Sequence, residues 1–192
     1  MRWSAKKSPL KKEPYYIERD EKARCEFDET LAELAPDIDV VYIDECGVKR
    51  QMPREYGRAP AGQRVFLPIS GKRLKKVNVI AGLRNGETIC PTNYGWNTNA
   101  AWFEEWFEWW LWPLLREGSV VIMDNASFHK KANLIRIALS YGLSIIWLPA
   151  YSPDKNPIEH VWANMKKWLR NFSKNYKSIR FAIAAYFERC SD

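Results

Sequence analysis

The chain has few cysteines and no long apolar run. Its four cysteines are widely scattered over 192 residues, so they form neither a closely spaced zinc motif nor a disulfide-rich scaffold. The N-terminus is basic but lacks the apolar segment of a secretory signal. Glutamates interrupt the aromatic stretch at 102–112, which excludes a membrane span there. We therefore expect a cytoplasmic protein in a reducing environment, built as one domain with a short appendage.

Acidic residues are absent from 161–180, where lysines and arginines give a local charge of +6. The whole chain carries +7, its first 24 residues carry +4, and another basic cluster lies at 71–76. Such clusters favour a polyanionic partner, although an ordinary lysine-rich surface would produce the same pattern.

Hydrophobic patterning predicts an α/β fold. Three strands precede a helix, after which strands and helices alternate, so we expect a mixed sheet with helices on both faces. We interpret residues 1–34 as a basic linker or arm and 35–192 as the folded domain, with short strands and turns at 47–70. The predicted strands are 39–44, 76–83, 87–91, 119–124 and 143–148, and the predicted helices are 21–34, 100–116 (interrupted at Pro113), 131–141, 157–172 and one after Ser178.

Three acidic residues stand at the ends of predicted elements. Asp44 and Asp124 each end an apolar strand, and Glu159 lies in the first turn of the helix after a third strand. Such ends meet at one edge of an α/β sheet, so we expect the three carboxylates to lie together. They would repel one another unless divalent metal lay between them. The trio therefore predicts a site for Mg²⁺ or Mn²⁺, where two ions can serve phosphoryl transfer.

Each carboxylate also has a purely structural interpretation. Asp44 and Asp124 could stabilise turns, and Glu159 could complete a capping box that begins at Asn156. Glu45 is an alternative to Asp44. Neighbouring strand residues point to opposite faces, so only one of the two should reach the site, and we favour Asp44.

Several neighbouring residues are candidates for supporting roles. Asn125 and His129 follow Asp124 and could position a phosphate or a ligand-bound water, or else form the turn and start the next helix. Asn156 is first a helix cap, with any ligand contact secondary. Lys166 and Arg170 share a helical stripe with Glu159 that suits phosphate contacts. The aromatic residues at 102–112 exceed one core-facing stripe, so some are available for a subunit contact or base stacking.

Three segments carry a family resemblance: Ile43–Gly47 (IDECG), Met123–His129 (MDNASFH) and Ser152–Trp162 (SPDKNPIEHVW). They resemble the catalytic motifs of mariner-like transposases, and more closely those of bacterial insertion-sequence relatives. A glutamate in third place, with 34 residues between Asp124 and Glu159, fits the bacterial branch. The resemblance covers about residues 20–192.

This resemblance implies a ribonuclease H-like fold with an Asp-Asp-Glu (DDE) triad at Asp44, Asp124 and Glu159. It implies an endonuclease and strand transferase that uses two Mg²⁺ or Mn²⁺ ions in DNA transposition and integration, at the bacterial nucleoid. The expected partners are transposon ends and target DNA, a second copy of the chain, and the product of an upstream reading frame. The expected DNA-binding residues are Lys166, Arg170, Lys167, Lys72 and Arg73.

One departure from the family concerns the N-terminus. Family members begin with helix-turn-helix modules, and this chain shows none, so we expect half of a split reading frame or a truncated remnant. The chain alone should then bind DNA weakly and without sequence preference. Two alternatives stay open: a catalytically silent DNA-binding remnant, and another ribonuclease H-like metal nuclease.

Overall fold

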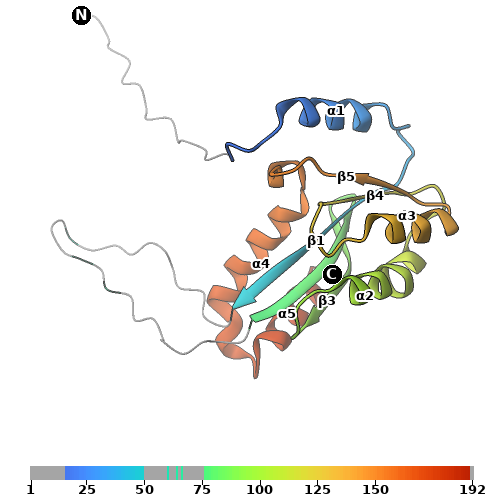
Figure 1. Ribbon diagram of the computed structural model, residues 1–192. Coiled ribbons are helices and arrows are strands. Elements are labelled where there is room, and N and C mark those ends of the chain that lie inside the picture. Colours follow the sequence, from blue (N-terminus) through green and yellow to red (C-terminus); the bar gives the residue numbers. More distant parts are fainter. Residues whose placement is uncertain (1–15, 50–59, 61–63, 65, 67–75, 191–192) are drawn as a thin grey trace, which may run out of the picture.

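A computed structural model describes residues 16–49, 60, 64, 66 and 76–190, and a five-stranded mixed sheet lies at its centre (Figure 1). The strand order is β3-β2-β1-β4-β5, with antiparallel pairs among the first three strands and parallel pairs from β1 to β5. The expected mixed sheet is confirmed. The strands are β1 Val40–Lys49, β2 Lys76–Arg84, β3 Glu87–Tyr94, β4 Val120–Met123 and β5 Ser144–Trp147.

The helices lie close to the predicted ranges, with one exception. Gly142, at φ +68°, follows α3 as expected for a residue that must adopt a left-handed conformation. Ser178 caps α5, where its side chain accepts a hydrogen bond from Phe181 N. The helices are α1 Glu21–Ala32, α2 Ala100–Glu105, α3 Lys131–Ser140, α4 Ile158–Phe172 and α5 Ile179–Glu188.

The exception is the aromatic helix predicted at 100–116. Its regular part ends at Glu105, well before Pro113, and continues as a π-helix at Trp106–Leu111 and a 3₁₀ turn at Trp112–Leu114. Trp106 is buried in this wider turn, whereas Trp109 is 68% exposed. The predicted interruption at Pro113 was therefore wrong in its position, because the α-helix already changes to a π-helix at Trp106.

Alternation along the strands divides the core between the two faces of the sheet. Val41 and Ile43 of β1 pack with α2, the π-helix and α3, whereas Cys46 and Val48 pack with α4 and α5. Phe27 places α1 on the same face as α4, against Val120, Ile122 and Leu148 (Figure 1). Two faces covered by helices leave the strand ends free to form a site.

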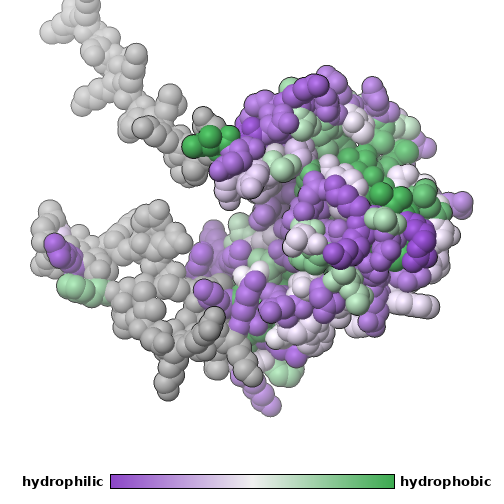
Figure 2. Space-filling view, viewed as in Figure 1, coloured by the Kyte–Doolittle hydropathy of each residue, from purple (hydrophilic) through white to green (hydrophobic). Residues whose placement is uncertain are grey.

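Figure 2 shows polar side chains over most of one side of the molecule, with hydrophobic side chains gathered between α1 and α3. Within the described residues, no helix is both long and apolar enough to cross a membrane. The predicted short strands and turns at 47–70 lie for the most part outside the described residues. The division into an arm at 1–34 and a domain at 35–192 stays a prediction.

Candidate active site

The three predicted carboxylates line a single cavity of about 500 Å³. Asp44 lies on β1, Asp124 directly follows β4, and Glu159 lies in the first turn of α4. The parallel pairing of β1 with β4 brings the first two to the same edge of the sheet. In the part of the chain that the structure describes, no three acidic, histidine or cysteine side chains are close enough to hold a metal ion as they stand. The carboxylates therefore surround the cavity without meeting at one point.

Asp44 is half-buried near another carboxylate, that of Glu159. Burial first, and the negative charge of Glu159 second, raise its pKa to about 7, against a hydrogen bond from Trp162 that lowers it. This bond runs from Trp162 Nε1 to Asp44 Oδ2 over 2.8 Å. The buried indole thus fixes the direction of the Asp44 carboxylate while leaving its charge uncompensated.

Asp124 is held by local hydrogen bonds and by His129. Its Oδ1 accepts a hydrogen bond of 3.0 Å from Ala126 N, and His129 Nδ1 lies 3.2 Å from the same oxygen. Burial alone would raise the pKa of Asp124, but these two interactions outweigh it and lower the pKa. Burial would also lower the pKa of His129, yet Asp124 and Glu45 raise it to about 9. His129 is therefore a buried imidazolium that orients Asp124.

Glu45 occupies the opposite face of β1 from Asp44, as the alternation predicted. Its Oε1 lies 3.6 Å from Nε2 of His129, and in the described structure neither buried atom has a hydrogen-bond partner. Burial raises the pKa of Glu45, against the stabilising charge of His129. Sequence reasoning weighed Glu45 as a substitute for Asp44. It missed this contact with His129, because no spacing along the chain signals it.

The two asparagines expected near the site hold its walls together. Asn125 Nδ2 donates a hydrogen bond of 2.8 Å to Leu148 O, which ties the end of β4 to the end of β5. The buried Asn156 accepts a hydrogen bond of 3.4 Å from Ile158 N, although the N-cap position of α4 itself is taken by Pro157. The capping box expected with Glu159 does not form, because Asn156 N donates to Pro153 O instead. The Glu159 carboxylate is thus not engaged in that capping bond.

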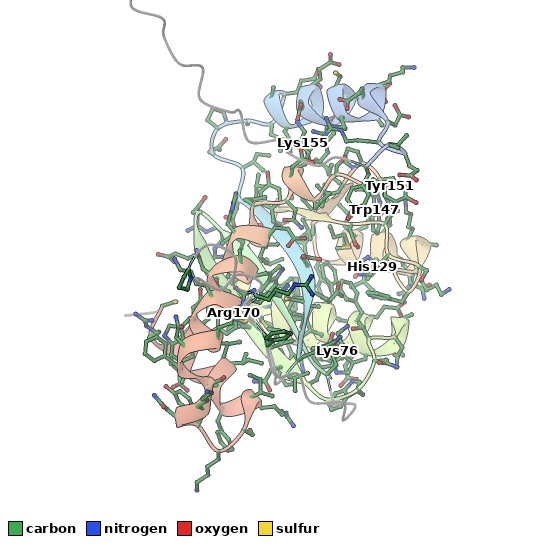
Figure 3. All side chains as sticks on the ribbon, turned by 90° about the vertical axis from the view of Figure 1, so that its left-hand side faces the viewer. Lys76, His129, Trp147, Tyr151, Lys155 and Arg170 are labelled. Atoms are coloured by element: carbon green, nitrogen blue, oxygen red, sulfur yellow. The ribbon has the colours of Figure 1, made fainter. Side chains whose placement is uncertain are left out.

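Side chains of helix α1 form ion pairs with the loop that leads into α4. Arg24 donates two hydrogen bonds to Asp154, of 3.0 and 2.6 Å, and Lys155 Nζ donates to Asp28 over 2.7 Å. Figure 3 shows Lys155 directly below α1. These partners lie more than a hundred residues apart in the chain, so no sequence pattern predicted them.

Two tyrosines at the cavity were also missed. Tyr16 and Tyr151 both line it, with ring centroids 5.6 Å apart, and each is about half exposed. The signal for such residues is an exposed aromatic side chain at the rim of a cavity. Exposure cannot be read from the sequence, so nothing in the sequence pointed to these two tyrosines.

The predicted DNA-binding residues fall into two groups. Lys166 is half-buried on α4, near enough to Cys46 to oppose the burial that raises the pKa of that thiol, and Lys167 and Arg170 are exposed. Figure 3 shows Arg170 on α4, below His129 and far from Lys155. Lys72 and Arg73 lie outside the described residues.

Comparisons with known proteins agree with this architecture. A sequence model of the family described as DDE superfamily endonuclease matches residues 39–180. The uncharacterized protein y4pE/y4sA of Sinorhizobium fredii (strain NBRC 101917 / NGR234) is 32% identical over 76 residues, which are 38% of this chain and 54% of that protein.

Solved structures of Mos1 transposase are similar in fold. Its strand transfer complex has a TM-score of 0.72 at 20% identity, covering 95% of this chain and 58% of that chain. Its paired-end complex with Mn has a TM-score of 0.72 at 16% identity, covering 96% of this chain and 60% of that chain. The expected ribonuclease H-like fold is thereby confirmed, and the chain spans little more than half the length of these relatives. Because the family match covers most of the chain, this protein belongs to the DDE superfamily endonucleases.

Proposed function

We propose that this chain is the catalytic domain of a DNA transposase that cleaves DNA and transfers strands. The observation that carries the proposal is the convergence of Asp44, Asp124 and Glu159 on one cavity, in a DDE endonuclease fold. An acidic cavity that repels phosphates needs a compensating charge before it can act on DNA. The proposal therefore includes a divalent metal.

The donor set fits Mg²⁺ or Mn²⁺. All three residues offer hard carboxylate oxygens, and burial together with the charge of Glu159 raises the pKa of Asp44, which a bound cation would oppose. Asp44, Asp124 and Glu159 would hold two such ions, whose charge would favour deprotonation of a water or 3′ hydroxyl and departure of the leaving oxygen. The Mos1 paired-end complex with Mn supports this assignment.

The surrounding residues would position the acids and the DNA. Trp162 and His129 fix the directions of Asp44 and Asp124 through their hydrogen bonds and charge. Lys166 and Arg170, on the helix that carries Glu159, would contact backbone phosphates of transposon-end or target DNA. Dimer formation and a partner encoded by an upstream reading frame belong to the same proposal.

Nicking of supercoiled plasmid in Mn²⁺ or Mg²⁺ tests the chemistry. We expect the wild-type chain to nick the plasmid without sequence preference. Asp124→Asn should lower the rate by about 10³-fold or more, because it removes a charged ligand and leaves the volume unchanged. The matched control is Asp154→Asn in the neighbouring loop, which should keep most of the activity. Equal rates for wild type and Asp124→Asn would remove Asp124 from the chemistry.

A further inference from the structure

A second groove adjoins the catalytic cavity and shares two of its carboxylates. It has a volume of about 340 Å³ and is lined by both Asp44 and Asp124, whereas Glu159 lines only the larger cavity. The groove follows β1 beyond Tyr42, the last residue that β4 pairs with. Its other walls come from the segments after β4 and before α2. The site therefore opens in two directions from the same pair of aspartates.

The lining of this groove suits a sugar-phosphate backbone. Three acidic residues line it, Asp44, Glu45 and Asp124. Lys76 is the one cation among the described residues that line it, and Asn97 and Thr98 add amide and hydroxyl groups. Asn78 is buried and fixed by a hydrogen bond of 2.6 Å from its Nδ2 to Trp96 O, which makes this wall rigid. A cation flanked by short polar side chains is the usual composition of a phosphate contact.

Gly47 creates the space that Lys76 occupies. A Cβ atom at Gly47 would overlap Cε of Lys76 and lie 2.5 Å from its Nζ, so the lysine side chain lies directly against the backbone of β1. Gly47 is three positions from Asp44 on the same strand. Lys166 approaches β1 beside Cys46, a residue that faces the opposite side of the strand from Gly47. The stretch of β1 after Asp44 thus has one lysine on each of its faces.

We propose that this groove binds the backbone of a second DNA strand, with Lys76 contacting one of its phosphates. The inference rests on the proposed function, because strand transfer requires two DNA segments at one set of carboxylates. The larger cavity, which contains Glu159, takes one segment. The Lys76 groove takes the other, and Asp44 and Asp124 are lining residues of both.

The test uses branched DNA that mimics a joined product, together with a linear duplex of the same length. Both carry a fluorescent label, and their binding to the chain is followed by anisotropy in Ca²⁺ over a range of KCl concentrations. Lys76→Met should weaken binding of the branched DNA by about 3- to 10-fold and reduce its salt slope by about 1. Lys22→Met, in an exposed part of α1 outside both cavities, is the matched control and should change neither quantity.

Gly47→Ala makes the test specific to the observed geometry. The new methyl group displaces the flexible end of Lys76 without removing its charge, so it should weaken branched-DNA binding in the wild-type background. In the Lys76→Met background it should have no further effect. Circular dichroism checks that each variant is folded.

The outcomes separate the two proposals. Wild-type affinity and salt slope in Lys76→Met would overturn the groove assignment and leave the proposed function standing. Independent, additive effects of Gly47→Ala and Lys76→Met would also overturn it. A wild-type chain that binds neither DNA would overturn both proposals.

Discussion

Two carboxylates near the cavity differ in whether a cationic side chain of the protein compensates their charge. Asp154 accepts two hydrogen bonds from the buried Arg24, and this guanidinium lowers the pKa of Asp154. Asp44 has only an indole N–H as partner, and burial beside Glu159 raises its pKa to about 7. The first acid is satisfied by a cation of the chain itself, and the second is not.

This difference separates a structural acid from a functional one. A buried carboxylate without an internal cation costs stability, so its retention indicates a ligand from outside the chain. Asp124 stands between the two cases, because His129 compensates it in part. Three acidic residues and no cationic one are among the described residues that line the cavity, which favours a bound cation.

The largest stability effect should come from neutralising Asp44. Its folded pKa of about 7 lies above the ordinary value of 3.8, so the associated stability is present below pH 4 and is lost as the pH rises through 7. Asp44→Asn keeps an acceptor for Trp162 and removes this loss. In EDTA at pH 8 we expect a gain on the order of 2–4 kcal/mol, measured by urea unfolding.

Asp154→Asn is the opposite case and serves as the control. It should destabilise the chain under the same conditions, because it removes the partner of Arg24. A loss of stability in Asp44→Asn at pH 8 would contradict the claim that the charge of Asp44, unlike that of Asp154, is uncompensated.

A smaller effect should follow from replacing His129. Its pKa of about 9, against an ordinary value of 6.5, means that its stabilisation is complete below pH 6.5 and is lost as the pH rises through 9. In EDTA at pH 6, His129→Gln should cost on the order of 2 kcal/mol relative to wild type, and the difference should shrink by pH 10. The exposed His160→Gln is the control. A cost that does not depend on pH would show that His129 acts by packing alone.

The smallest effect concerns the ion pair between α1 and the loop. Arg24 is buried but Asp154 is 53% exposed, so solvent weakens the interaction. Arg24→Met should cost about 1–2 kcal/mol in the free energy of unfolding. Lys22→Met, on the exposed side of α1, should be close to neutral. Thermal melts of both variants at low and high salt would test this, and equal stabilities would remove the pair from the account.

The strands and the acidic residues of the site could be predicted from the sequence because both depend on local patterns. Apolar runs predicted the strands of the sheet, and the acids that follow these runs predicted which residues surround the cavity. The predicted end of the first strand at Asp44 was wrong, because β1 stays paired with β2 as far as Lys49. The turn between β2 and β3 was also predictable, because an Asn-Gly pair is typical of tight hairpin turns. Asn85 and Gly86 both adopt the positive φ that such a turn requires, at 51° and 84°.

The remaining features depend on packing between distant segments. The Arg24–Asp154 pair joins residues 130 positions apart, and the contact of Lys76 with Gly47 depends on the β1–β2 register. The π-helix at Trp106–Leu111 places Trp106, Phe107 and Leu111 in the core, and helical periodicity of 3.6 residues does not predict a π-helix. Local chemistry therefore located the acids, and tertiary contacts decided which of them are compensated.

Calorimetric titration of Mn²⁺ into the metal-free chain tests the central claim most directly, because it does not depend on DNA or turnover. The account predicts that the wild type and Asp154→Asn bind Mn²⁺ alike. Asp124→Asn and Glu159→Gln should each lose about 10-fold or more in affinity. Unchanged Mn²⁺ affinity in Asp124→Asn and Glu159→Gln would contradict the account.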